Sequence, residues 1–183
     1  MQKYLITSKE LYTDIPEIFC SRLDLQIKKH NPSYALYRDK SNPNYSNLAA
    51  LFAKLCAENV GVKSFLHQDV ELAKKLAVTG VHLASTQFAK IEDAKSLGLE
   101  VIISTHTKGE VLLAQKLGAD AVTYSPIFAS PNKGKPKGIN DLKELLEICK
   151  IDVFALGGIV TKEHLEKIAQ TKVYGFASIR YFY

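Results

Sequence analysis

The most constraining feature of this sequence is a regular alternation of short apolar segments with segments of helical periodicity. Each apolar segment except the last precedes a stretch in which apolar residues recur at helical spacing. Parallel neighbouring strands need a crossover connection of about a dozen residues or more, usually a helix. The alternation therefore predicts a parallel sheet covered by helices. The eight candidate strands are residues 3–7, 34–38, 63–67, 80–84, 100–105, 120–125, 152–157 and 173–178.

This alternation predicts an α/β fold, a small (β/α)8 TIM barrel formed by residues 1–183 as a single domain. The chain is short for such a barrel, since about 250 residues are typical. After the last candidate strand only residues 179–183 remain, so we expect the eighth helix to be truncated or missing. A homodimer or another covering element would then close the uncovered apolar surface. An open doubly wound sheet is the alternative fold.

The composition is that of a soluble globular protein, with 46% hydrophobic and 23% charged residues. No apolar stretch is long enough to cross a bilayer, and the first residues lack the pattern of a signal peptide. We therefore expect a cytoplasmic protein with no membrane partner. Cys20, Cys56 and Cys149 lie far apart in helix-like segments, which favours reduced core thiols over disulfides or a metal site.

The net charge of +5 arises from 24 Lys and Arg against 19 Asp and Glu. A modest excess of this kind suits a phosphorylated small molecule as well as a nucleic acid. The basic residues are concentrated only in the segment NKGKPKG (132–138), and they do not interleave with aromatic residues on one face. We therefore expect no nucleic-acid partner.

Ligand-binding residues of parallel α/β folds gather at the carboxyl ends of the strands. Arg38 and Lys40 follow the second candidate strand and favour an anionic ligand, although a surface salt bridge with Asp39 explains Arg38 equally well. Gly157 and Gly158 follow the seventh strand, where barrels often bind phosphate and where a tight turn would also require glycine. These strand ends therefore favour a phosphorylated ligand.

Ala177 and Ser178 end the eighth candidate strand, beside the expected phosphate position. A helix N-terminus contributes only about 0.3 to 1 kcal/mol to anion binding, so we expect help from a cation. Lys133, Lys135 and Lys137 are the candidates for this role. By composition alone, their segment is a solvated loop.

The segment STHT (104–107) places a histidine where the fifth candidate strand ends. Ser104 and His106 are two residues apart and therefore face the same side of that strand. Because histidine gains and loses a proton near neutral pH, His106 is either an acid and base or only a polar residue at a strand end. His82 is expected in the interior, and no carboxylate projects with His67 and His82, so we expect no metal site.

Five short motifs occur in a characteristic order along nearly the whole chain. This order resembles that of the thiamine phosphate synthase and TenI family of small (β/α)8 barrels. The motifs are YRDK (37–40), STHT (104–107), GAD followed by SPIF (118–128), ALGGI (155–159) and FASI (176–179).

The resemblance implies a phosphate site at the mouth of the barrel. It places the Thr-x-Thr-Lys phosphate loop of the family on Ser130, Asn132 and Lys133. The remaining positions that it implies are the basic pair Arg38 and Lys40, the glycines Gly157 and Gly158, and the last phosphate contact Ser178.

The synthase branch of the family holds Mg²⁺ with two aspartates, which the resemblance places at Gln68 and at or near Gln87. Neutral amides are poor replacements for carboxylates around Mg²⁺. Leu36 stands where the synthase usually has a glutamine that helps to hold its pyrimidine. These differences favour the TenI branch, which resembles thiazole tautomerase and needs no cofactor.

The resemblance leaves three functional hypotheses open, each with a phosphorylated thiazole or thiamine phosphate as partner. The first is a thiazole phosphate tautomerase of thiamine biosynthesis, in which His106 moves a proton within a carboxythiazole phosphate. The second is a thiamine phosphate synthase that joins hydroxymethylpyrimidine diphosphate to thiazole phosphate and releases pyrophosphate, with Mg²⁺ held at an altered site, through Asp69. The third is a barrel that binds thiamine-precursor phosphates without catalysis.

Overall fold

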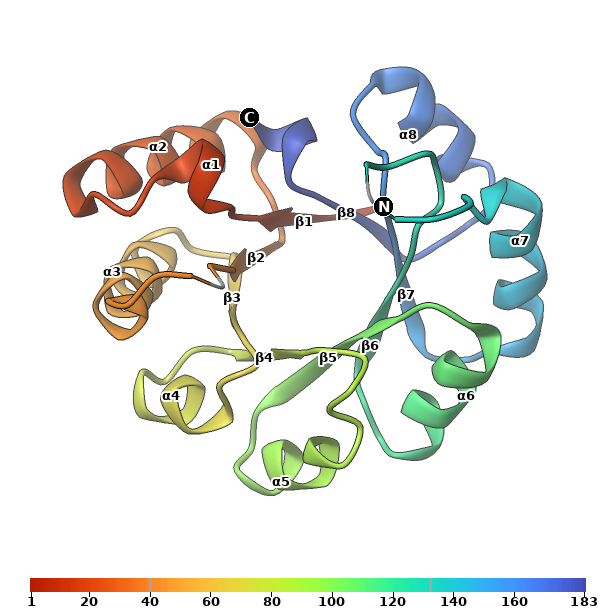
Figure 1. Cartoon of the computed structure of the whole chain (residues 1–183), viewed down its shortest axis with the longest axis horizontal. Helices are drawn as coiled ribbons and strands as arrows, with labels where there is room; N and C mark the ends of the chain where they lie inside the picture. Colours follow the sequence, from red (N-terminus) through yellow and green to blue (C-terminus); the bar gives the residue numbers. More distant parts are fainter. Residues whose placement is uncertain (40, 132) are drawn as a thin grey trace.

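Eight parallel β-strands close into a barrel in the computed structural model, which describes residues 1–39, 41–131 and 133–183 (Figure 1). Each strand pairs with the next along the chain, and β8 pairs with β1. The predicted TIM barrel is confirmed, and the alternative of an open doubly wound sheet is wrong. The strands are β1 Gln2–Ile6, β2 Tyr34–Tyr37, β3 Lys63–His67, β4 Gly80–Leu83, β5 Glu100–Thr105, β6 Ala121–Tyr124, β7 Asp152–Leu156 and β8 Gly175–Ser178.

The α-helices form an outer ring around the strands (Figure 1). Two helices follow β1, because the single turn α1 ends at Thr13, whose φ of 64° lies in the left-handed region. Pro16 then begins α2, at a position where its missing N–H leaves no helical hydrogen bond unmade. The helices are α1 Lys9–Tyr12, α2 Pro16–His30, α3 Tyr45–Glu58, α4 Val70–Lys75, α5 Lys90–Ser96, α6 Lys108–Lys116, α7 Gly138–Ile148 and α8 Lys162–Ala169.

The lower part of the barrel interior is filled by large side chains from alternating strand positions. Tyr4 is fully buried there, and its ring centroid lies 5.1 Å from that of Phe154. This aromatic packing closes the interior below the carboxyl ends of the strands, where ligands of such barrels bind. The interior cluster consists of Tyr4, Ile6, Tyr34, Leu36, Phe65, Ile102, Ala121, Phe154 and Ala177.

The described residues after β8 form a short 3-10 turn, Arg180–Phe182, which agrees with the predicted truncation of the helix after β8, since α8 lies between β7 and β8. Phe182 is fully buried and stacks on Phe176, with the ring centroids 5.5 Å apart. It also meets the His30 ring edge to face at 5.4 Å. The tail is therefore a covering element of the kind expected at this position, and the homodimer stays a prediction.

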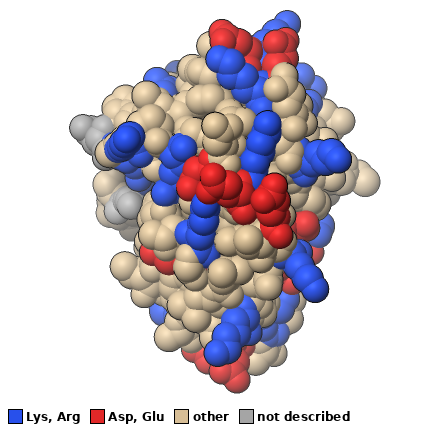
Figure 2. All heavy atoms as spheres, turned by 90° about the vertical axis from the view of Figure 1, so that its right-hand side faces the viewer, with Lys and Arg blue, Asp and Glu red and all other residues tan. Residues whose placement is uncertain are grey.

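The surface mixes charges of both signs. Figure 2 shows the face on the α7 side, where Lys and Arg side chains surround a central group of Asp and Glu. Lys108 of α6, for example, lies with its Nζ 2.6 Å from Glu144 Oε2 of α7. Among the described residues, no helix has both the length and the apolar character needed to cross a membrane.

Truncation of the buried tail aromatic tests the role of the tail as a cover. We expect Phe182→Ala to lower the free energy of unfolding by about 3 to 5 kcal/mol, because the substitution leaves a cavity against Phe176. Urea unfolding provides the measurement. The control Leu25→Ala, at a side chain that is 59% exposed, should change stability by about 0.5 kcal/mol or less. Equal effects of the two substitutions would contradict the covering role.

Candidate functional site

A cavity of about 250 Å³ opens at the carboxyl ends of the strands, and we call it the mouth cavity. It brings together six of the residues predicted from the sequence: Arg38, Ser104, His106, Ser130, Lys133 and Gly157. Its other lining residues are Ile6, His67, Gln68, Ala84, Ser85, Ser125, Pro126, Leu156 and Ile179. The predicted residues Lys40 and Asn132 lie outside the residues that the structure describes.

The backbone of His106 is held by the first turn of α6. Glu110 accepts hydrogen bonds from the backbone N–H groups of His106 and Thr107 through Oε2, and Thr107 Oγ1 accepts from the Glu110 N–H at 3.1 Å. This reciprocal capping box satisfies helix N–H groups that would otherwise lack partners. Glu110 was not among the predicted site residues, although the sequence pattern Thr-x-x-Glu signals this arrangement.

The hydrogen bonds of the His106 ring define which nitrogen is available to a ligand. Nδ1 lies 3.2 Å from the Ser125 carbonyl oxygen and 3.3 Å from Ser125 Oγ. A carbonyl oxygen only accepts hydrogen bonds, so Nδ1 of the neutral ring carries the proton and donates it. Nε2 therefore carries the lone pair, and it makes no hydrogen bond to another described residue. The arrangement is that of a base whose orientation is fixed by the protein.

Ser104 lies on β5 at the floor of the mouth cavity and contacts a buried histidine. Its Oγ is 2.9 Å from His82 Nε2, and His82 Nδ1 is 2.9 Å from the Tyr4 hydroxyl oxygen. His82 is 2% exposed, which confirms its predicted interior position. Burial lowers the pKa of His82 to about 3, with smaller contributions from the nearby charges of His67 and Arg38. His82 is therefore neutral near neutral pH.

Two glycines after β7 let the β7–α8 loop pack against the β6–α7 loop. Gly157 and Gly158 have φ values of 99° and 70°, a region that other residues rarely adopt. A Cβ on Gly157 would lie 2.7 Å from Pro126 Cα, and one on Gly158 would lie 2.5 Å from the Ala129 carbonyl oxygen. The tight turn, which the sequence analysis gave as one of the two explanations for these glycines, is therefore present. The backbone N–H groups of both glycines donate no hydrogen bond to another described residue.

A second cavity, of about 710 Å³, continues from Arg38 and Gly157 toward the end of the chain. Ser178 lines it but is only 5% exposed. The Ser178 hydroxyl donates to the Ile159 carbonyl oxygen at 2.8 Å and accepts from the Tyr181 N–H at 3.2 Å. Its hydrogen-bonding capacity is thus largely used within the protein.

Ala177 does not reach the site with its side chain. It is fully buried among the interior side chains of the barrel, and its strand position pairs with Tyr4 and Leu156. The strand-end position expected from the sequence is correct, but alternation along β8 directs this methyl group into the core. The structure therefore does not bring Ala177 together with the other predicted residues.

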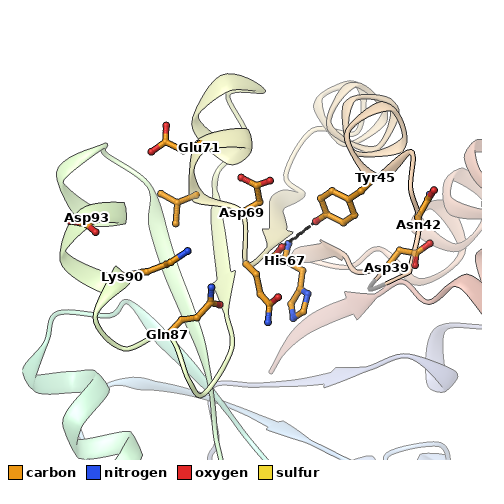
Figure 3. A pocket seen from close by; sticks show the side chains of 11 residues that line it. Asp39, Asn42, Tyr45, His67, Asp69, Glu71, Gln87, Lys90 and Asp93 are labelled. Atoms are coloured by element: carbon orange, nitrogen blue, oxygen red, sulfur yellow. Dashed lines mark hydrogen bonds between the residues drawn. The ribbon is translucent and has the colours of Figure 1, made fainter.

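A third cavity, of about 790 Å³, lies beyond His67 and Gln68 on the outer side of the mouth (Figure 3). We call it the acidic cavity, because four carboxylates line it, from Asp39, Asp69, Glu71 and Asp93, together with Lys90 among the described residues. Figure 3 shows these carboxylates apart from one another: Asp39 follows β2, Asp69 and Glu71 lie at the start of α4, and Asp93 lies on α5. Asn42, Tyr45, Val70 and Gln87 complete the lining.

Comparison with known protein families shows to which family the chain belongs. A family model described as thiamine monophosphate synthase matches residues 3–182. The chain belongs to this family. The resemblance found in the sequence is therefore confirmed at the level of the family.

Individual members of the family are similar to the chain over most of its length. The thiamine-phosphate synthase of Lactococcus lactis subsp. cremoris (strain MG1363) is 30% identical over 67% of this chain, and that of Methanosarcina barkeri (strain Fusaro / DSM 804) is 34% identical over 73%. The matched regions span 58% and 61% of those two relatives. The structure of thiamine phosphate pyrophosphorylase from Pyrococcus furiosus is similar as well, with a TM-score of 0.80 and 27% sequence identity. The match covers 97% of this chain and 85% of the Pyrococcus furiosus chain.

The residues at the acidic cavity do not fit the Mg²⁺ ion that the synthase branch implies. Gln87 Oε1 accepts the Ala84 N–H at 2.9 Å, and Asp69 Oδ1 accepts the Leu72 N–H at 2.9 Å as the N-cap of α4. Within residues 1–39, 41–131 and 133–183, no three His, Cys, Asp or Glu side chains converge to hold a metal ion. Magnesium requires oxygen ligands in near-octahedral geometry, usually with carboxylates among them.

The neutral state of buried His82 predicts an acid-sensitive contribution to stability. An unfolded histidine titrates near about 6.5, so between this value and the folded pKa the unfolded chain binds a proton that the folded chain does not. Stability should therefore fall as the pH falls from about 6.5 toward 3. As the pH falls, the free energy of unfolding of the wild type should decrease by up to about 1.4 kcal/mol per pH unit more than that of His82→Gln. Urea unfolding at a series of pH values measures both slopes, and identical slopes would contradict the assignment.

Proposed function

We propose that this member of the family is a thiazole phosphate tautomerase of the TenI type that works without a metal. The observation that carries the proposal is the orientation of His106, whose Nδ1–H donates to the Ser125 carbonyl oxygen while Nε2 is available at the mouth cavity. A neutral imidazole held in this way is suited to take a proton and to return it. The misfit of Gln68 and Gln87 with Mg²⁺ supports the same choice.

The reaction requires only the movement of one proton. His106 Nε2 removes the proton from the ring carbon of the thiazole tautomer, and the electron pair of the broken C–H bond shifts toward the exocyclic alkene. The alkene carbon then takes the proton back from Nε2, which leaves an aromatic ring and a neutral His106. The Ser125 carbonyl oxygen stabilises the imidazolium that exists between the two steps, because it accepts the Nδ1–H.

The phosphate of the substrate is expected at the Gly157 to Gly158 turn. Both N–H groups there lack a described protein partner, and N–H groups of this kind bind anions. Lys133, Ser130 and Arg38 line the same cavity and supply two positive charges and a hydroxyl. Arg38 is partly buried, which lowers the pKa of its guanidinium, but nearby Glu10 and Asp39 oppose this effect. Arginine keeps its charge at neutral pH.

Removal of the His106 imidazole tests the proposal. His106→Ala should lower kcat for conversion of the carboxythiazole phosphate tautomer about 100-fold to 10,000-fold, because general acid and base catalysis contributes this factor. The KM should change little, since the phosphate contacts remain. The control His30→Ala removes the histidine that ends α2 and packs against Phe182, away from the cavity residues, and should leave kcat unchanged. A His106→Ala rate equal to that of the wild type would refute the proposal.

The second candidate function is thiamine phosphate synthase, and the names of the similar proteins favour it. It would require Mg²⁺ beside a pyrophosphate, at a place where this chain has amides and scattered carboxylates. Carboxylates that hold no metal ion repel the pyrophosphate group of the substrate. Because the residues of the acidic cavity do not fit Mg²⁺, we expect the wild type to form no thiamine phosphate at any Mg²⁺ concentration. Product formation from hydroxymethylpyrimidine diphosphate and thiazole phosphate would reverse the order of the two candidates.

The third hypothesis, a barrel that binds thiamine-precursor phosphates without catalysis, is separated by the same assays. Tight binding of thiazole phosphate with no turnover of either kind would support it. The cytoplasmic location, the homodimer and the lack of a nucleic-acid partner stay predictions of the sequence.

A further inference from the structure

The feature that the proposed function leaves unexplained is a histidine inside the aromatic barrel core. The His82 ring lies 5.7 Å from the Tyr4 ring, measured between centroids, and Tyr4 in turn packs against Phe65 and Phe154. A buried polar group is destabilising unless its hydrogen bonds are made. Both ring nitrogens of His82 have a partner, the Tyr4 hydroxyl on one side and Ser104 Oγ on the other.

The direction of these hydrogen bonds follows from the surroundings of Tyr4. The Tyr4 side chain is fully buried among rings, and its hydroxyl has no partner other than His82 in the described part of the chain. If His82 Nδ1 donated to this hydroxyl, the phenolic proton would be buried without an acceptor, which is costly. The Tyr4 O–H therefore donates to Nδ1, and a neutral imidazole that accepts at Nδ1 carries its proton on Nε2.

Ser104 connects His82 with the mouth cavity. His82 Nε2–H donates to Ser104 Oγ, so the serine oxygen is already an acceptor. Ser104 lines the mouth cavity and has no other hydrogen-bond partner among the described residues. Its own proton is therefore directed away from His82, toward the cavity.

We propose that Tyr4 and His82 are positioning residues that fix the Ser104 hydroxyl as a hydrogen-bond donor to the ligand. The ligand then presents an acceptor atom, such as a carboxylate oxygen, to Ser104. This inference rests on the proposed function for the identity of the ligand, and it adds a second role on β5. His106 exchanges the proton, and Ser104 holds the acceptor group.

The state of His82 tests the inference without any ligand. In protein labelled with ¹⁵N at histidine, NMR correlations through the ring should show His82 with its proton on Nε2 and an unprotonated Nδ1. This state should persist through the pH range in which a free histidine titrates. A proton on Nδ1, or a doubly protonated ring near neutral pH, would overturn the inference.

A pair of tyrosine variants tests the consequence for the site. Tyr4→Phe removes only the hydroxyl that fixes the His82 tautomer, whereas the control Tyr34→Phe removes a hydroxyl that bonds to Tyr174 in the same cluster. We expect Tyr4→Phe to weaken binding of the carboxythiazole phosphate about 10-fold, equivalent to about 1.4 kcal/mol, and Tyr34→Phe to leave binding unchanged. Equal losses in the two variants would indicate a merely structural role.

A double-mutant cycle with Ser104→Ala completes the test. If Tyr4 acts through Ser104, then Ser104→Ala should weaken binding much less in the Tyr4→Phe background than in the wild type. Fully additive losses would overturn the inference. If the wild type neither binds nor converts the thiazole phosphate, the proposed function fails, while the NMR result still decides the arrangement of Tyr4, His82 and Ser104.

Discussion

The pairing of β8 with β1 is the interaction on which the rest of the structure depends. It joins residues at the two ends of the chain, with Gln2 opposite Gly175 and Leu5 opposite Ser178. Closure places the carboxyl ends of all eight strands around one mouth, so that loops distant in sequence line one cavity. Among the described residues, Phe182 of the 3-10 turn after β8 covers this seam by its burial against Phe176.

Closure also separates two electrostatic environments at the mouth. On one side, at the mouth cavity, Lys133, Arg38 and the N–H groups of the glycine turn after β7 present positive charge and donors. On the side of β3 and β4, carboxylates and neutral amides line the acidic cavity. The first side therefore suits an anionic group, whereas on the other side four carboxylates outweigh Lys90 among the described residues. This asymmetry supports the proposed isomerisation of one phosphorylated substrate over the joining of two.

Much of this arrangement was predictable from the sequence, because the relevant signals are local. Alternating strand and helix patterns predicted the barrel, and the short stretch after residue 178 predicted a truncated helix after β8, where the described residues form a 3-10 turn. Motifs at strand ends located six of the residues that line the mouth cavity, among them His106 and Gly157. Each of these features depends on periodicity or position along the chain, both of which are visible without coordinates.

The remaining features depend on the register of strands and loops, which no local pattern specifies. The Tyr4 and His82 contact joins residues 78 positions apart, and the Ser178 hydroxyl is bonded to Ile159 from a different loop. The burial of Ala177 and of Phe182 likewise follows from closure. Side chains that look available at a strand end can thus be used within the protein, as Ser178 is.

A structure of the protein with carboxythiazole phosphate bound would be the most direct test of the proposed role of His106. The account predicts that His106 Nε2 lies within about 3 to 3.5 Å of the carbon that exchanges the proton. It also predicts that the phosphate contacts the N–H groups of Gly157 and Gly158. A ligand bound with its reacting carbon away from the His106 ring, or with its phosphate in the acidic cavity, would contradict the account.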